Sequence, residues 1–306
     1  MSAVILDNVR KVFQEEGGKP VVAVDHLSLN IARGEIFSLV GPDGAGKTTT
    51  IRMMCGVLPP TDGSIRLQGL DIAKDREEIK KHIGYLSQRF SLYGDLTIDE
   101  NIDFFAEIHK VKDYKVRKEE LLQFTRLMPF RDRLAARLSG GMKQKLALAC
   151  TLVHAPDIIF LDEPTTGVDP VSRRDFWKIL STLLKSGITI VVTTPYLDEA
   201  ERSNRVALMN EGRLLMCDTP EKVKQSFPFD VFEVVCNNPR KMVEDLQSVF
   251  SKKDIQLFGD RLHLLQPKGR GSEELVKTQL QQRGLLIQSV RRIAPSLEDV
   301  FVSAIT

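Results

Sequence analysis

The sequence predicts an α/β protein with a mostly parallel sheet, a helical segment inserted into that sheet and a small α+β domain at its C-terminal end. Four apolar runs rich in β-branched residues alternate with helical patterns, as a sheet buried on both faces requires. These runs cover residues 35–40, 158–161, 188–192 and 206–209. Between the first two runs, apolar positions recur at helical spacing, and after residue 228 the pattern becomes β-α-β-β-α-β.

Length and composition indicate a globular protein of two domains, one large and one small. The chain has 306 residues, 42% apolar and 27% charged, and its net charge of +2 gives no electrostatic reason to expect nucleic acid as a partner. No apolar run approaches the roughly 20 residues that cross a bilayer, and no secretory signal is visible. The scattered cysteines are expected to be reduced thiols in a cytoplasmic protein. They are Cys55, Cys150, Cys217 and Cys236.

The N-terminal segment is predicted to contain strands at residues 4–6 and 21–24, separated by a turn at residues 15–20. Phe13 lies just before this turn. Its ring could stack on an adenine face, which is worth about 1–3 kcal/mol by analogy with base stacking. It could equally be a core residue at the end of a strand, and its position alone does not separate the two interpretations.

A glycine-rich loop joins the strand at residues 35–40 to a helix at residues 50–55. Glycines let the backbone curl with its N–H groups pointing inward, and the helix adds its positive dipole end, so this context predicts a phosphate-binding loop. Lys47 is expected to reach the β- and γ-phosphates, and the Thr48 hydroxyl to ligate Mg²⁺. The predicted nucleotide-binding residues here are Gly41, Pro42, Asp43, Gly44, Ala45, Gly46, Lys47, Thr48 and Thr49.

The inserted helical segment, at about residues 89–155, is predicted from its spacing and its start signal. Thr97 and Glu100 are spaced as a capping box, which predicts that a helix begins at Thr97. A second helix is expected at residues 116–127. Short strands are expected before this segment, at residues 64–67 and 84–86.

Two adjacent carboxylates follow the apolar strand at residues 158–161. A strand end places Asp162 beside the phosphate-binding loop, where it can hold the Mg²⁺ shell through water. Glu163 can then orient or deprotonate an attacking water. An isolated Asp-Glu pair is usually a solvated turn, but a pair that ends a buried strand downstream of such a loop is not.

A second candidate anion site is the start of the helix that follows Leu138. Ser139, Gly140 and Gly141 expose backbone donors at a helix N-terminus, about 90 residues after the first loop. One chain with one nucleotide cannot easily use both sites. We therefore expect a partner chain to complete each nucleotide site.

The region after a break at residues 227–229 is predicted to be a ferredoxin-like domain spanning residues 229–306, following a first domain of residues 1–228. Its strands are expected at residues 231–236, 255–258, 262–266 and 285–290, and its helices at residues 239–250 and 272–283. The segment has no cluster with catalytic spacing, so a structural or regulatory role is expected.

Taken in order, these motifs resemble those of the ATP-binding subunit of ABC transporters, over residues 1 to about 230. The resemblance implies a P-loop NTPase fold, with Walker A at Gly41–Thr48, Walker B at Asp162, the catalytic base at Glu163 and the signature at Ser139–Gln144. It implies that Gln88 is the Q-loop glutamine, which takes part in catalysis with Lys47 and in holding Mg²⁺. Phe13 falls at the adenine-stacking position. Residues 167–170 resemble the D-loop, and residues 194–200 and 295–301 resemble drug- and antibiotic-export subunits.

One position departs from the family pattern. Pro195 stands where most relatives have a histidine that contacts the γ-phosphate, and proline offers neither a side-chain donor or acceptor nor a backbone N–H. Losing one such contact can cost about 10²–10³ in rate. We expect ATP binding to survive and turnover to be slow, although Glu163 and the partner's signature could suffice. The histidines of the chain, His26, His82, His109, His154 and His263, lie elsewhere in the sequence.

The resemblance implies an ATPase that binds ATP and Mg²⁺, dimerises on ATP and drives a separate transmembrane permease, as a multidrug-exporter type of subunit on the cytoplasmic face of the membrane. The alternative is a soluble ABC ATPase that acts on ribosomes or nucleic acid. Such proteins usually carry twin cassettes, a basic surface or a long coiled-coil insertion. The chain has one cassette and no sustained heptads.

Overall fold

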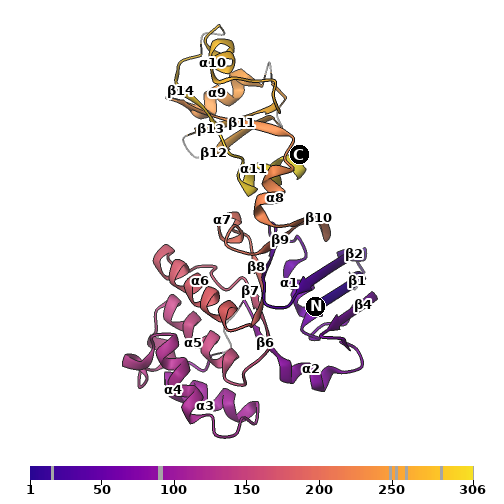
Figure 1. Cartoon of the computed structure of the whole chain (residues 1–306), viewed down its shortest axis with the longest axis vertical. Coiled ribbons are helices and arrows are strands. Elements are labelled where there is room, and N and C mark those ends of the chain that lie inside the picture. Colours follow the sequence, from indigo (N-terminus) through magenta and orange to yellow (C-terminus); the bar gives the residue numbers. More distant parts are fainter. Residues whose placement is uncertain are drawn as a thin grey trace. The chain divides into compact units, whose positions relative to one another are not determined.

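A computed structural model of the chain describes residues 1–14, 17–88, 92–247, 250–251, 254–258, 261–282 and 285–305 (Figure 1). The described residues divide into two compact units, Met1–Asp218 and Thr219–Thr306, whereas we expected the boundary at residue 228. Part of the predicted turn at residues 15–20 lies outside the described residues. Each unit is described by itself.

The central sheet of the first unit has the strand order β10-β9-β3-β8-β7-β6. Its strands are β10 (Arg213–Asp218), β9 (Arg205–Asn210), β3 (Ile36–Val40), β8 (Thr189–Thr194), β7 (Ile158–Asp162) and β6 (Ile83–Leu86). From β9 to β6 every neighbouring pair is parallel, and β10 pairs antiparallel with β9 through a tight turn. The predicted mostly parallel sheet is confirmed.

Successive side chains of these strands point to opposite faces of the sheet, and each face contributes to a separate hydrophobic core. Phe37 and Phe160 belong to one core, together with residues of α1 (Lys47–Met54), whereas Ile159 and Leu161 belong to the other. The second core contains apolar residues of α5 (Gly140–Leu152) and α6 (Pro170–Lys185). Helices α1 and α5 therefore pack on opposite faces of the central sheet.

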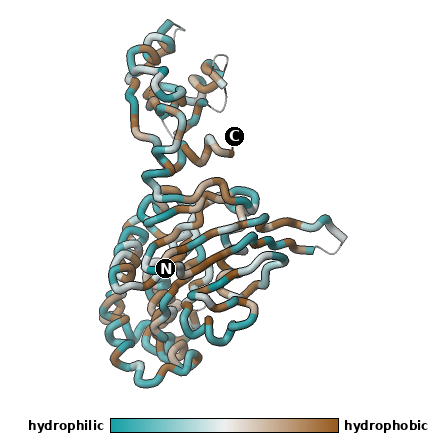
Figure 2. Tube along the Cα trace, turned by 45° about the vertical axis from the view of Figure 1, so that its right-hand side comes forward, coloured by the Kyte–Doolittle hydropathy of each residue, from teal (hydrophilic) through white to brown (hydrophobic). Residues whose placement is uncertain are grey.

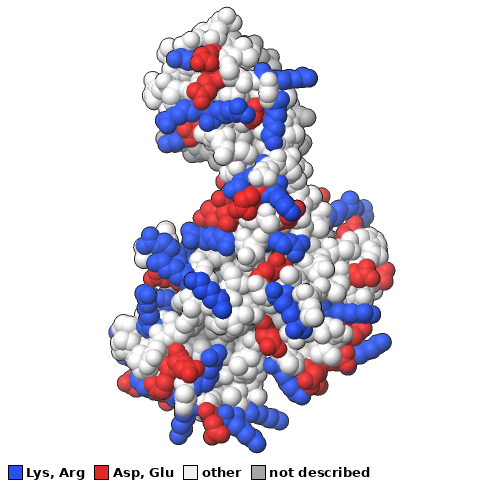
Figure 3. Space-filling view, viewed as in Figure 1, with Lys and Arg blue, Asp and Glu red and all other residues white. Residues whose placement is uncertain are grey.

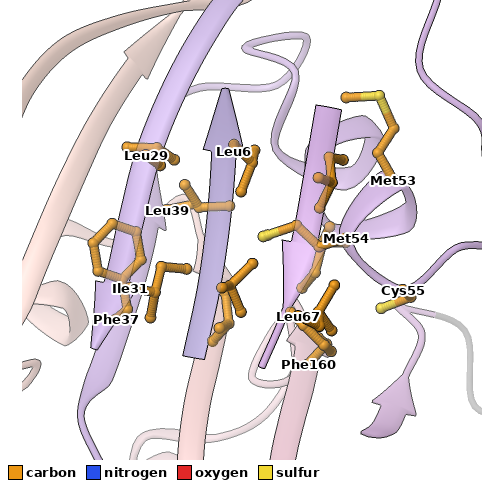
Figure 4. Close-up of a cluster of buried hydrophobic side chains, with 14 of the residues drawn as sticks. Leu6, Leu29, Ile31, Phe37, Leu39, Met53, Met54, Cys55, Leu67 and Phe160 are labelled. Atoms are coloured by element: carbon orange, nitrogen blue, oxygen red, sulfur yellow. The ribbon is translucent and has the colours of Figure 1, made fainter. Parts of the chain in front are cut away.

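An antiparallel sheet covers the α1 face, with the order β2-β1-β4-β5. Its strands are β1 (Ser2–Phe13), β2 (Val21–Ala32), β4 (Asp62–Leu67) and β5 (Leu70–Asp71), and α2 (Arg76–His82) follows. Figure 4 shows how Leu6, Leu29 and Ile31 of this sheet lie in one cluster with Phe37 and Leu39 of the central sheet. Figure 2 shows the same pattern along the chain, since apolar residues follow the strands while the helices alternate between apolar and polar.

The predicted helical segment connects β6 to β7 in the sequence and lies beside these two paired strands (Figure 1). It comprises α3 (Ile98–Ile108), α4 (Lys115–Phe124), short 3₁₀ turns at Met128–Phe130 and Ala135–Arg137, and α5. The predicted capping box is present, because Thr97 accepts from the Glu100 N–H and the Glu100 side chain accepts from the Thr97 N–H. Helix α4 ends at Phe124, three residues before the predicted end. The first predicted residues, 89–91, lie outside the described part.

The second unit begins with α8 (Pro220–Gln225) and has a ferredoxin-like sheet in the order β12-β13-β11-β14, with all neighbours antiparallel. The elements are β11 (Phe229–Cys236), α9 (Pro239–Leu246), β12 (Ile255–Phe258), β13 (Arg261–Pro267), α10 (Glu273–Gln281), β14 (Ile287–Ile293) and α11 (Leu297–Ile305). The predicted β-α-β-β-α-β order is confirmed. Helix α9 is shorter than expected, and the predicted end of α10 at residue 283 is not described.

Candidate functional site

The predicted phosphate-binding loop lies between β3 and α1 and needs its glycines. Gly44 and Gly46 have φ angles of +82° and +95°, in the left-handed region that side chains disfavour. A Cβ on Gly46 would lie 2.4 Å from the Ala23 carbonyl oxygen, and one on Gly41 would lie 2.2 Å from that of Met209. The loop is thus packed against β2 and β9 so closely that only a backbone without side chains fits, as a phosphate cradle requires.

Lys47 occupies the centre of this loop. Its ammonium donates to the carbonyl oxygens of Gly41 and Pro42, at 2.8 and 3.0 Å, and lies 3.2 Å from Glu163 Oε1. The side chain is buried, with 4% of the residue exposed. A buried cation that is held by carbonyl oxygens can exchange these contacts for phosphate oxygens when a nucleotide binds.

Asp162 and Thr48 meet at the end of β7, as the sequence predicts for a magnesium site. Thr48 Oγ1 donates to Asp162 Oδ1 at 3.0 Å, and Thr193 Oγ1 donates to the same oxygen at 2.8 Å. Asp162 Oδ2 is buried and has no hydrogen-bond partner among the described residues. Burial raises the pKa of Asp162 above its ordinary value, and the hydrogen bonds from Thr193 and Thr48 offset only part of this effect. An orphaned, desolvated carboxylate oxygen beside a hydroxyl fits a divalent cation.

This candidate cation site contains few protein ligands. Among the described residues, no group of three or more histidine, cysteine or acidic side chains could hold a metal ion. Mg²⁺ usually keeps waters and is bound by one or two carboxylates plus substrate phosphates, so Thr48 and Asp162 are a sufficient protein contribution.

The structure brings Glu163 to the same place and holds it in an uncommon backbone conformation. Its φ is +46°, and its backbone N–H donates to Thr193 Oγ1 at 2.8 Å. Gln88 Nε2 donates to Glu163 Oε2 at 3.0 Å, and Thr166 Oγ1 donates to the same oxygen at 3.3 Å. Both carboxylate oxygens of Glu163 are therefore engaged, one by Lys47 and one by Gln88 and Thr166.

Phe13 lies at the end of β1, opposite Val21 of β2, and 39% of the residue is exposed. The ring is not part of the core, so the interpretation as a core residue is wrong. Lys11 Nζ lies 5.3 Å from the ring centroid. Ala23, also on β2, packs against Gly46 of the phosphate-binding loop. Phe13 is therefore at the end of the β1-β2 pair that borders this loop.

The predicted second anion site begins α5. Ser139 is the N-cap and accepts from the Met142 N–H at 3.3 Å, and both Ser139 and Gly140 are exposed. Gly141 is buried against α6, where a Cβ would lie 2.5 Å from Ser172 Oγ. Since α5 packs on the face of the central sheet opposite α1, the structure does not place the two helices on one face.

Pro195 directly follows β8 and is half-buried. The histidines of the first unit make their contacts elsewhere. His26 contacts Asn8, and His82 contacts Asp157. His109 and His154 stack on each other with centroids 3.9 Å apart.

Sequence reasoning missed Thr193, whose hydroxyl contacts both Asp162 and the Glu163 backbone. The two strands β7 and β8 are in register here, with Asp162 opposite Thr193. The signal in the sequence was a polar residue, Thr193, at the end of a buried apolar strand. The register that places Thr193 opposite Asp162 cannot be predicted from one sequence.

Comparisons with known proteins agree with this geometry. Residues 24–166 match the family described as ABC transporter. The chain is 42% identical over 205 residues to the probable multidrug ABC transporter ATP-binding protein YbhF of Escherichia coli (strain K12). These residues cover 66% of this chain and 35% of YbhF. This chain thus spans about a third of the length of YbhF.

Other relatives are similar over most of both chains. The Nod factor export ATP-binding protein I of Paraburkholderia xenovorans (strain LB400) is 36% identical over 258 residues, with 83% of each chain covered. The daunorubicin/doxorubicin resistance ATP-binding protein DrrA of Streptomyces peucetius is 32% identical over 292 residues, covering 92% of this chain and 87% of that one.

Solved structures show the same fold over about 70% of the chain. The dimeric post-hydrolysis structure of the ATP-binding cassette MJ0796 bound to ADP and Pi matches with a TM-score of 0.65 and 27% identity, over 71% of this chain and 98% of that one. A further dimeric structure of MJ0796, a bacterial ABC transporter cassette, matches with a TM-score of 0.64 and 28% identity, also over 71% and 98%. This chain belongs to the ATP-binding proteins of ABC transporters, which are ATPases coupled to transport.

Proposed function

We propose that this chain binds ATP with Mg²⁺ at the loop of residues 41–48, and that a second ATP-binding cassette closes over that nucleotide with its signature helix. The observation that carries the proposal is the placement of α1 and α5 on opposite faces of one sheet. Ser139 and Gly140 are exposed, so they are free to cap a nucleotide held by another cassette. The dimeric cassette structures of MJ0796 support this arrangement.

Each residue of the pocket then has a distinct task. Lys47 exchanges its carbonyl partners for phosphate oxygens, and the loop's backbone N–H groups bind the remaining oxygens. Thr48 and Asp162 would hold Mg²⁺, which would supply positive charge beside the transferring phosphoryl group. Once Lys47 turns to phosphate, Glu163 Oε1 becomes available to accept a hydrogen bond from the attacking water. Gln88 remains positioned to hold the other oxygen of Glu163.

Hydrolysis at this site is proposed to be slow because of Pro195. Pro195 offers no side-chain donor to the γ-phosphate, and one such contact is worth about 10²–10³ in rate. A partner cassette that keeps a histidine would then carry out most of the turnover, with Ser139–Gly141 of this chain as its clamp.

The proposed membrane partner is a separate permease, and the whole assembly is proposed to work as an exporter at the cytoplasmic face. Within the described residues, every helix is too short or too polar to cross a membrane. An open groove of about 1080 Å³ lies between the ends of α1, α3 and α5. Val57 and Ile108 line it and are 60% and 56% exposed, and we propose this groove as the surface that contacts the permease.

The alternative, an ABC ATPase that acts on ribosomes or nucleic acid, has less support. The relatives that cover most of this chain are named for export or drug resistance. Figure 3 shows basic and acidic side chains interspersed over the visible face of the first unit, rather than a continuous basic surface.

The proposal is tested by Glu163→Gln, which removes the base but keeps the side-chain shape. We expect this variant to bind ATP and to elute as a dimer in size-exclusion chromatography with ATP and Mg²⁺, because the clamp closes and cannot reopen. The double variant Glu163→Gln/Ser139→Ala is the control, and it should dimerise more weakly. If ATP-bound Glu163→Gln elutes as a monomer, pairing between two copies of this chain is contradicted.

A further inference from the structure

A buried carboxylate outside the predicted site is bonded through both of its oxygens. Glu199 lies in α7 (Leu197–Ala200) and is 2% exposed. Its Oε2 accepts from Thr165 Oγ1 at 2.7 Å and from Thr194 Oγ1 at 3.1 Å, and its Oε1 accepts from Arg173 Nε at 2.8 Å. Burying a carboxylate is costly unless its hydrogen bonds are satisfied, so three short bonds indicate a specific arrangement.

These three partners belong to three segments, and each segment borders a predicted functional feature. Thr165 follows Glu163 by two residues. Arg173 lies in the first turn of α6, whose N-cap Asp169 belongs to the segment that resembles the D-loop. Thr194 ends β8 and directly precedes Pro195. One carboxylate thus connects the segment of the proposed base, the segment that resembles the D-loop and the loop that contains Pro195.

Thr194 precedes Pro195, and Tyr196, the residue that follows Pro195, is held by contacts with Arg173 and Thr194. The guanidinium of Arg173 lies 4.2 Å from the Tyr196 ring centroid, and the Tyr196 N–H donates to Thr194 Oγ1 at 3.0 Å. Burial alone would lower the pKa of Arg173, but the hydrogen bond and charge of Glu199 outweigh it and raise that pKa. Pro195 has no backbone N–H of its own, so its position is set by these neighbours on either side.

We propose that Glu199 is a positioning residue for ATP hydrolysis, which holds the Glu163 segment, the start of α6 and the Pro195 loop as one rigid body. The proposal rests on the proposed role of Glu163 as the base. It implies that a partner cassette that presses on the start of α6 moves Glu163 and the Pro195 loop together. A misplacement of about 1 Å in such a body can cost about 10² in rate.

The first test is Glu199→Gln, which keeps the shape of the side chain and removes its charge opposite Arg173. We expect the rate of ATP hydrolysis in single-turnover experiments to fall about ten- to hundredfold. The Kd for ATP should change less than about threefold, since Lys47 bonds to Gly41 and Pro42, and Thr48 bonds to Asp162, without Glu199. Asp175→Asn is the matched control, because Asp175 lies on α6 with Arg173 and pairs with the exposed Lys178. It should leave both values unchanged.

A second variant separates positioning from mere stability. Thr165→Val removes one neutral hydroxyl and should slow hydrolysis about fivefold, roughly the worth of one hydrogen bond. If the two residues act through one rigid body, Glu199→Gln/Thr165→Val should be no slower than Glu199→Gln alone. Multiplied losses in the double variant, or hydrolysis at the wild-type rate by Glu199→Gln with only a lowered Tm, would overturn the proposal.

The same measurements distinguish this inference from the proposed function. If the role of Glu163 is wrong, Glu163→Gln hydrolyses ATP at the wild-type rate. If the role of Glu199 is wrong, Glu163→Gln is inactive while Glu199→Gln is fully active.

Discussion

The first unit has two helix N-termini that the sequence predicts to bind phosphate, and they differ in how much of a site each one carries. The start of α1 is enclosed, because Gly41 and Gly46 pack against neighbouring backbone and Lys47 is 4% exposed. The start of α5 is open, with Ser139 and Gly140 exposed and one N-cap hydrogen bond from Met142. The same local motif, a glycine-rich helix start, thus forms a pocket in one place and a surface in the other.

The difference lies in what surrounds each helix start. At α1, the parallel strand β7 ends beside the loop and brings two carboxylates, Asp162 and Glu163, within hydrogen-bond or ion-pair distance of Thr48 and Lys47. At α5, the residues that pack nearby belong to α6 and leave the exposed backbone uncovered. A helix dipole alone is a weak anion site, which is why we propose that the start of α5 contacts a nucleotide that another cassette already holds.

The largest effect that would separate these two ends is expected for Lys47→Ala. The pocket loses its buried cation, and a charge-assisted contact to phosphate is worth about 3 kcal/mol, so the Kd for ATP should rise about 100-fold or more. Fluorescence titration with an ATP analogue measures it. Ser139→Ala in the separated monomer is the control and should keep the wild-type Kd. Equal losses in both variants would contradict the division between pocket and surface.

The local parts of this comparison could be predicted from the sequence. The loop of residues 41–48 encodes its own backbone, because Gly44 and Gly46 adopt positive φ angles. The capping box of Thr97 and Glu100 is likewise a contact between residues three apart. In both cases the structure depends on residues that are close together in the sequence, so their spacing is enough to predict it.

The contacts that complete the pocket could not be predicted from the sequence. The hydrogen bond between Gln88 and Glu163 joins residues 75 positions apart, and that between Thr193 and Asp162 depends on the register of β7 and β8. The hydrogen bonds of Glu199 with Thr165 and Arg173 likewise join residues 34 and 26 positions apart. Long-range register and burial are properties of the whole fold, which one sequence does not reveal.

The next effect concerns the Pro195 loop at the closed end. Pro195→His would supply a donor to the γ-phosphate, and a φ compatible with proline is open to histidine as well. A fully placed donor is worth about 10²–10³, but a grafted side chain recovers only part, so we expect hydrolysis to rise about tenfold. Steady-state phosphate release measures the rate, with the ATP Kd as the control. A fast wild-type protein with no gain from Pro195→His would contradict the slow-site proposal.

The smallest effect is a gain in stability at the closed end, with none expected at the open end. Asp162→Asn keeps the acceptor for Thr48 and Thr193 and removes a desolvated charge whose second oxygen has no partner among the described residues. Because burial raises the pKa of Asp162 in the folded protein, the wild-type chain loses stability as the pH rises from the ordinary value of about 3.9 through the raised pKa. The gain from Asp162→Asn should therefore be full at neutral pH and shrink as the pH falls.

A gain of about 1 kcal/mol would raise the Tm of the nucleotide-free protein by about 2–4 °C, measured by thermal unfolding at two pH values. The same variant should no longer gain stability from ATP and Mg²⁺ over ATP alone, whereas the wild-type protein should. Ser139→Ala removes an N-cap at the open end and should instead cost about 1 kcal/mol, with little dependence on pH. A destabilised Asp162→Asn protein would contradict this prediction. It would show that the charge of Asp162 stabilises the nucleotide-free fold instead of costing stability.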